Sequence, residues 1–119
     1  MTPQQNKTLH RAVSIFGKRN QTMQSIEELI ELQKALFENV HRGTDNRINI
    51  VEEMADVEIM LTQLRDIYDV KEEELNKVKD YKIGRLDHTI EKYLNKEKQS
   101  NAVQPVKEVH IDRNTSNGR

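Results

Sequence analysis

Apolar residues recur at intervals of three and four through most of the chain, the spacing that gathers side chains on one face of an α-helix. The two prolines, Pro3 and Pro105, lie near the ends, so every residue between them has the amide hydrogen that a helix needs. Few segments alternate between apolar and polar residues, and runs of β-branched residues are scarce. The pattern therefore predicts an all-α fold.

Capping residues and glycines divide the first part of this pattern into two helices. Thr8 is suited to cap a short helix over residues 9–16, which Gly17 would end. A longer helix is expected over residues 22–40. The following segment, 41–48, is rich in turn-forming residues and is predicted to be a loop.

Two further long helices are predicted after this loop. Asn49 is a good N-cap, with a glutamate three positions later as in a capping box, and its helix is expected to end near Tyr68. Asp69 repeats the pattern for a helix that ends near Asn95. The short link between these two helices favours an antiparallel hairpin. We therefore expect an antiparallel bundle of three long helices with a short N-terminal helix.

These helices are predicted to form one domain over residues 8–96, followed by a polar tail over residues 97–119. The tail is rich in Asn, Ser, Lys and Gln and has no sustained periodicity, which is typical of a flexible segment or a loosely attached arm. Its apolar residues offer a weak pattern for a short strand-like contact. They are Val103, Val106, Val109 and Ile111.

The composition narrows the classes of function. Hydrophobic residues make up 34% of the chain, with two Phe and no Trp, so the core is lean and oligomerisation is expected to complete it. A net charge of −1 gives no case for nucleic acid or an anionic membrane as partner. The lack of cysteine excludes disulfides and thiolate metal sites. Without a bilayer-length apolar run or a signal-peptide core, the expected compartment is the cytoplasm.

Paired acidic residues on two successive helices are the most informative chemical feature. Glu28 and Glu31 are three positions apart, as are Glu53 and Asp56, so each pair shares a helix face. Like charges this close repel one another unless a cation lies between them. Four carboxylates without sulfur or imidazole suit a hard divalent ion such as Mg²⁺ or Mn²⁺.

The four acids differ in how close they lie to the apolar side of their helices. At about 100° per residue, Glu53 falls within the apolar arc of its helix and Asp56 at the edge, although a buried carboxylate must be neutralised, paired or metal-bound. That arc consists of Ile50, Met54, Val57, Met60, Leu61, Leu64 and Ile67. Glu28 and Glu31 lie outside the apolar stripe of their helix, and they join Glu53 only if their flank faces it. That stripe consists of Ile26, Leu29, Ile30, Leu36, Phe37 and Val40.

The last helix carries basic residues on its apolar side. Lys82 lies in the middle of its stripe, with Arg85 and Lys79 on the flanks. Inward basic groups require anionic partners, either the acids above or phosphate oxygens, although Lys82 could also extend its amino group into water. Gly84 lies within this helix at a cost of about 1 kcal/mol relative to Ala, which indicates a kink or a close backbone approach.

The order of these motifs resembles the MazG-like all-α nucleoside triphosphate pyrophosphohydrolases, over about residues 9–94. Its diagnostic part is the pair of acidic motifs in order on successive helices. The matching run is Phe16-Gly17, Gln21, Glu27-Glu28-x-x-Glu31, a loop, Glu52-Glu53-x-x-Asp56-Val57, and a helix bearing Lys and Arg. The phrase from Asn49 to Met60 is especially similar to the small single-domain members.

The resemblance implies Mg²⁺-dependent hydrolysis of a nucleoside triphosphate between its α- and β-phosphates, and assembly as a homodimer or homotetramer. By motif position, the metal ligands would be Glu28, Glu31, Glu53 and Asp56. Glu27 and Glu52 would be nearby catalytic helpers. The residues placed to contact the phosphates are Lys79, Lys82 and Arg85, and Gln21 would approach the base or sugar. No aromatic pair that would sandwich a nucleobase is evident, and Phe16 and Phe37 are the only candidates.

Two other interpretations compete with the enzyme. The main alternative is a non-enzymatic helical interaction protein whose acidic residues are simply solvated, since glutamate-rich helix surfaces are common. A carboxylate-bridged di-iron bundle is disfavoured because such sites use Glu-x-x-His motifs and neither acidic pair ends in His. The four histidines are scattered and show no ligand spacing.

Overall fold

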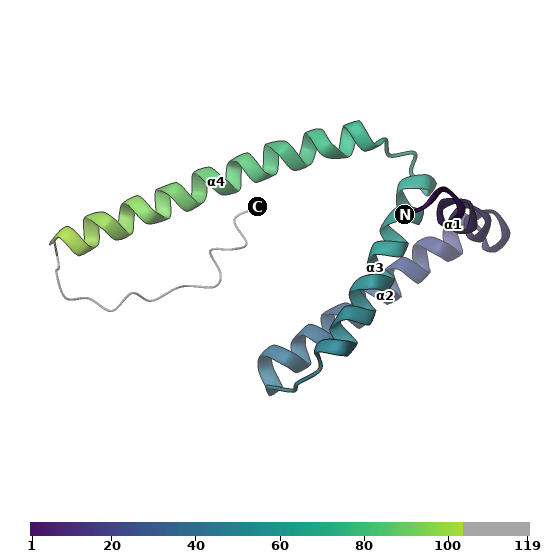
Figure 1. The fold of residues 1–119 in the computed structure, drawn as a ribbon, viewed down its shortest axis with the longest axis horizontal. Coiled ribbons are helices and arrows are strands. Elements are labelled where there is room, and N and C mark those ends of the chain that lie inside the picture. The colour runs from purple at the N-terminus through teal and green to yellow at the C-terminus, as the bar shows by residue number, and fades with distance from the viewer. Residues whose placement is uncertain (104–119) are drawn as a thin grey trace. The chain divides into compact units, whose positions relative to one another are not determined.

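A computed structural model describes residues 1–103 of the chain, and these residues form four helices without strands (Figure 1). The helices are α1 (Pro3–Phe16), α2 (Lys18–Arg42), α3 (Arg47–Ile67) and α4 (Glu72–Val103). The prediction of an all-α fold is confirmed. Within this part of the chain, no helix combines the length and the apolar character that crossing a bilayer requires.

The N-terminal helix begins earlier than predicted. Thr2, rather than Thr8, is its N-cap: the Thr2 hydroxyl accepts a hydrogen bond from the Gln5 backbone N–H (3.1 Å), and the Gln5 side chain accepts one from the Thr2 N–H (2.8 Å). Pro3 then occupies the first helical position, where its missing N–H costs nothing. Thr8 lies inside the helix, and its hydroxyl donates to the Gln4 carbonyl (3.2 Å). The capping box over residues 2–5 therefore adds more than one turn to α1.

Gly17 is the whole connection between α1 and α2. Its φ of 95° and ψ of 147° are accessible to glycine and strained for other residues. Because a single residue suffices, α2 begins at Lys18 rather than near residue 22.

The loop between α2 and α3 is shorter than the predicted 41–48. α2 ends at Arg42, and Gly43 follows as its C-cap in a left-handed conformation (φ 66°). Asn46 is the N-cap position of α3. The Asn46 side-chain amide donates to the Ala35 carbonyl (2.9 Å), which ties the end of the loop back to α2. Asn49, the predicted cap, therefore lies in the first turn of α3.

α4 also extends beyond its predicted end near Asn95. Residues 97–103, which the prediction placed in the polar tail, continue the helix. The proposed strand-like contact involving Val106, Val109 and Ile111 lies outside the described residues. The chain divides into two compact units, Met1–Lys71 and a second beginning at Glu72. The hairpin of α3 with α4, and a single domain over residues 8–96, stay predictions.

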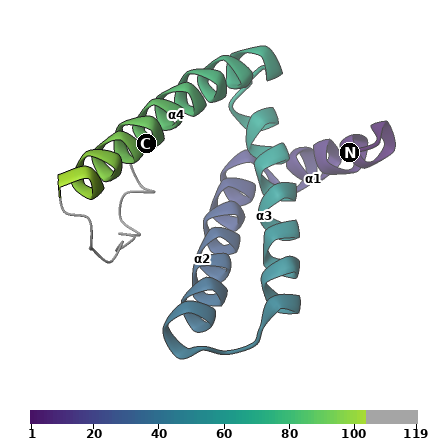
Figure 2. The ribbon, with the colours of Figure 1, turned by 60° about the vertical axis from the view of Figure 1, so that its left-hand side comes forward.

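In the first unit, α2 and α3 lie side by side and antiparallel, with α1 against one end of the pair (Figure 2). The antiparallel register appears in the side chains, because Gln21 pairs with Gln63 near one end and Ala35 with Asn46 near the other. The buried apolar residues are few. They are Val13, Ala35, Val57 and Met60. Ser25 and Gln63 are the buried polar residues, so the seam between the helices is partly polar.

The apolar stripe predicted for α2 is not its buried side. The six residues of that stripe, Ile26 to Val40, are between 40% and 64% exposed. The positions that face α3 come one residue before those of the predicted stripe. They include Gln21, Ser25, Glu28 and Leu32. In α3, Met54 and Leu61 of the predicted arc are likewise exposed, at 47% and 46%.

Several of the exposed apolar residues of α2 and α3 project to the same side of the helix pair. On both helices they follow the contact positions by one residue, and in an antiparallel pair such positions project to the same side. We call this surface the apolar flank. It consists of Ile26, Leu29, Leu36 and Val40 on α2 and of Val51, Met54 and Leu61 on α3.

Candidate metal centre

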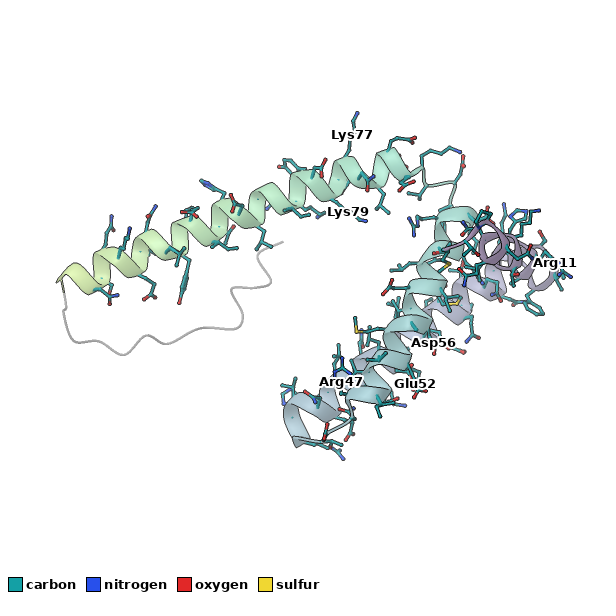
Figure 3. The ribbon with its side chains drawn as sticks, viewed as in Figure 1. Arg11, Arg47, Glu52, Asp56, Lys77 and Lys79 are labelled. Atoms are coloured by element: carbon teal, nitrogen blue, oxygen red, sulfur yellow. The ribbon has the colours of Figure 1, made fainter. Side chains whose placement is uncertain are left out.

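Three carboxylates converge at the seam between α2 and α3. One oxygen from each of Glu28, Glu53 and Asp56 lies within 4.8 Å of the other two. Glu28 comes from α2, and the other two come from successive turns of α3, on which Figure 3 labels Asp56 and Glu52. We call these three residues the carboxylate cluster.

The phase of the helices accounts for the position of the cluster. Glu28 occupies a contact position of α2 between Ser25 and Leu32, and Glu53 occupies one of α3 between Ile50 and Val57. Both glutamates are consequently half-buried, whereas Asp56 is exposed. The inward position predicted for Glu53 agrees with this arrangement. The condition set for Glu28, that its flank must face α3, is also met.

The cluster concentrates negative charge. Partial burial raises the pKa of Glu28, and the neighbouring Asp56 and Glu53 raise it further, against the lowering effect of a hydrogen bond from Gln24. Desolvation also raises the pKa of Glu53, and the charges of Asp56, Glu31 and Glu52 add to the rise, while Lys34 opposes it. Both glutamates therefore hold a proton more tightly than an isolated carboxyl would. A bound cation would relieve the same repulsion.

Glu31, the fourth predicted ligand, is not part of the cluster. Its carboxylate lies 3.6 Å from the Lys34 ammonium, and both side chains are at least half exposed. It is still near enough for its charge to raise the pKa of Glu53. Glu31 therefore borders the cluster, held by a cation three residues further along α2.

The two predicted helper residues differ in their relation to the cluster. Glu27 and Glu52 are exposed, and Glu52 acts on the cluster through its charge on Glu53. No described contact brings Glu27 to the three carboxylates.

Gln21 has a partner that sequence reasoning missed. Its side-chain amide donates a hydrogen bond to the side-chain oxygen Oε1 of Gln63 at 2.7 Å, and Gln63 is only 4% exposed. Gln21 is seven residues before Glu28, and Gln63 is seven after Asp56, so the pair lies two turns from the cluster along the same seam. This seven-residue spacing was the signal that could have identified Gln63.

A second polar contact lies beyond Gln63, between α1 and α3. His10 Nδ1 lies 2.8 Å from Asp66 Oδ2, both exposed, beside a cavity of about 240 Å³. Asn6, Leu9 and Gln63 also line this cavity. His10 was one of the histidines without a pattern in the sequence, and only the packing of α1 on α3 gives it a partner.

The predicted phosphate-contacting residues belong to the other unit. Lys79, Lys82 and Arg85 are exposed on α4, where Figure 3 labels Lys79. The Arg85 guanidinium lies 5.8 Å from the centre of the Tyr81 ring, a cation–π distance. Gly84 has open space around it within the described residues, so no neighbouring chain segment explains its position.

The donor set of the cluster fits a hard divalent cation. It offers carboxylate oxygens alone, from two helices whose backbones hold them in place, as Mg²⁺ and Mn²⁺ require. A scan against protein-family models and comparisons with curated proteins and solved structures found no match for this chain.

Proposed function

We propose that this protein is a Mg²⁺-dependent nucleoside triphosphate pyrophosphohydrolase. The reaction consumes one water and breaks the bond between the α-phosphorus and the bridging oxygen, giving a nucleoside monophosphate and pyrophosphate. The observation that carries the proposal is the convergence of Glu28, Glu53 and Asp56 from two helices. The resemblance of the two acidic motifs to the MazG-like enzymes supplies the substrate class.

The charge of the site requires an ion between protein and substrate. A triphosphate is polyanionic and would be repelled by the carboxylate cluster. Glu28, Glu53 and Asp56 would hold Mg²⁺, or Mn²⁺ in its place. When bound, the metal supplies positive charge for the phosphate oxygens and lowers the pKa of a coordinated water.

Other residues of the chain have narrower roles in this proposal. Glu31 would become a fourth ligand by leaving Lys34, a solvent-exposed pairing that costs little to break. Glu52 and Glu27 would accept hydrogen bonds from water near the site. As the resemblance implies, Gln21 would approach the sugar or base, and Lys79, Lys82 and Arg85 stay the predicted phosphate contacts.

The proposal includes assembly as a homodimer or homotetramer. Within residues 1–101, four apolar residues are buried, which is little for a stable domain. The seven residues of the apolar flank are all at least 40% exposed. A second copy of the chain is the partner that would cover the flank. The flank shares no residue with the cluster, so assembly through it would not use the three carboxylates themselves.

The test is a pyrophosphate-release assay with a panel of ribo- and deoxyribonucleoside triphosphates, with Mg²⁺ and with a chelator. We expect metal-dependent formation of monophosphate, and a loss of at least about 10³-fold in Glu53→Gln, since a metal ion contributes several kcal/mol to such a reaction. Glu58→Gln is the matched control, because Glu58 is an exposed glutamate of the same helix outside the cluster.

The alternative is a helical interaction protein with solvated acidic residues. It predicts no turnover of any nucleotide in the panel and no effect of Mg²⁺ on thermal stability. Equal activity of Glu53→Gln and Glu58→Gln would also argue against the proposed site.

A further inference from the structure

Gln24 lies one helical turn before Glu28 on α2 and contacts it directly. Its side-chain Nε2 donates a hydrogen bond to Glu28 Oε1 at 3.0 Å, in a partly buried position. An amide donor one turn away restricts the rotation of the carboxylate, because leaving the observed rotamer would break the bond. One oxygen of Glu28 thereby accepts the amide hydrogen of Gln24 while the carboxylate stays in the cluster with Glu53 and Asp56.

Glu31 provides an internal comparison. It is on the same helix, three residues from Glu28, and belongs to the same acidic motif. Its partner is the cation Lys34, three residues towards the C-terminus, and its carboxylate lies outside the cluster. Of Glu28 and Glu31, the one held by a neutral amide lies with Glu53 and Asp56, and the one paired with a cation does not.

The chemistry of the donor accounts for this difference. A neutral amide fixes a carboxylate without cancelling its charge, so the charge stays available to a divalent ion. A lysine in the same place would occupy the carboxylate as a competing cation. The hydrogen bond also favours the charged form of a carboxylate that is crowded by two others.

We propose that Gln24 is a positioning residue that orients the Glu28 carboxylate for a divalent cation. This inference rests on the proposed function, because it takes the carboxylate cluster to be a metal site. It assigns to Gln24 a role that neither acidic motif contains. Its effect should appear in metal affinity, and in turnover only as a consequence of metal affinity.

The experiment measures Mg²⁺ affinity by isothermal titration calorimetry on the full chain. Gln24→Met keeps the length of the side chain and its helix propensity but removes the donor. We expect about 10-fold weaker binding, at the lower end of the effect of losing a residue that supports a metal ligand. Gln33→Met is the control, because Gln33 is an exposed glutamine of the same helix with no contact to the cluster. Thermal unfolding without metal verifies that each variant folds, and Gln24→Ala replaces Gln24→Met if it does not.

A double-mutant cycle isolates the Gln24–Glu28 pair. With Glu28→Gln already present, Gln24→Met should cause less than a twofold further change in Mg²⁺ affinity. Equal Mg²⁺ affinity of Gln24→Met and Gln33→Met, or a full 10-fold effect in the Glu28→Gln background, would overturn the inference while the proposed function stands. If the unaltered protein binds Mg²⁺ and releases pyrophosphate, only the role of Gln24 is in question. If it does neither, both proposals fail together.

Discussion

Two surfaces of the α2–α3 pair, the carboxylate cluster and the apolar flank, have contrasting chemistry on the same two helices. The carboxylate cluster places three acids within 4.8 Å of one another. The apolar flank leaves seven hydrophobic side chains at least 40% exposed. Both arrangements cost free energy in a single chain, since crowded carboxylates repel one another and exposed apolar side chains are unfavourably hydrated. The comparison teaches that a helix pair can carry crowded charge and exposed apolar surface at the same time, around a small buried core.

The largest effect is expected from a charge placed on the apolar flank. Leu29→Lys should weaken self-association by roughly 10²–10³-fold, because an unpaired charge buried in an interface costs about 3–5 kcal/mol. Sedimentation velocity over a concentration series measures this. Ile59→Lys is the control, because Ile59 is exposed on α3 but lies off the flank. The flank would have no role in assembly if the unaltered protein were monomeric at every concentration. The same conclusion would follow if both variants associated equally.

Two methionines of α3 allow the contributions of the core and of the apolar flank to stability to be compared. Met60 is 7% exposed and Met54 is 47% exposed. Met60→Ala should lower the free energy of unfolding by about 2–5 kcal/mol through the cavity that it leaves. At concentrations where the chain is monomeric, Met54→Ala should cost less than half as much. Urea denaturation measures both, and equal losses in the dilute protein would show that the flank is already covered within one chain.

The glutamine pair in the seam is expected to have an intermediate effect. Gln21→Leu leaves the buried Gln63 oxygen without its donor and should cost about 1–3 kcal/mol in thermal unfolding. Replacing both residues by leucine should restore most of that loss, because no polar group is then left unpaired. A double variant less stable than the single one would indicate that the seam requires polar side chains there.

The smallest effect is the pH dependence that the cluster causes without metal. Because the pKa values of Glu28 and Glu53 are raised, the folded chain holds these two protons more tightly than the unfolded chain does. The protonated glutamates therefore contribute their full stability below the ordinary pKa of 4.5. This contribution is lost as the pH rises through the raised pKa values. Asp69 acts in the opposite direction, since Lys71 lowers its pKa and its contribution is lost only as the pH falls through that lowered value, below 3.8.

Urea midpoints between pH 4 and pH 7, compared with those of a Glu28→Gln, Glu53→Gln double variant, isolate the contribution of the cluster. In chelator, the unaltered protein should lose stability relative to the double variant as the pH rises. Added Mg²⁺ should reverse this trend, because the deprotonated carboxylates bind the ion. Parallel pH profiles in chelator would contradict the interpretation of the two raised pKa values.

The sequence was sufficient to predict that the secondary structure is α-helical, because this depends on the local spacing of apolar residues and on the lack of internal proline. Helix ends were less accurate. Thr2 and Asn46 took the N-terminal positions assigned to Thr8 and Asn49, and each lies close enough to a helix-compatible segment for the helix to extend to it. Caps compete locally, and the pattern of apolar residues does not decide between neighbouring candidates.

The contact face of α2 could not be predicted from its apolar stripe. The prediction assumed that the most hydrophobic side faces its neighbour, whereas Gln21, Ser25 and Glu28 face α3. That assumption fails wherever an apolar surface is reserved for something outside the chain. The same reasoning succeeded for Glu53, because its helix has both a buried and an exposed apolar side and Glu53 lies on the buried one. Gln24, Gln63 and the His10–Asp66 contact depend on rotamers and on packing between helices, which periodicity does not contain.

The single-residue joint at Gly17 has a consequence for how the sequence can vary in length. With no loop to absorb an added residue, one insertion between His10 and Gly17 would turn the preceding part of α1 by about 100° and carry His10 away from Asp66. The segment over residues 43–46 has no such constraint at its exposed positions. Insertions and deletions among relatives of this chain should therefore accumulate between α2 and α3 and be rare between His10 and the start of α2.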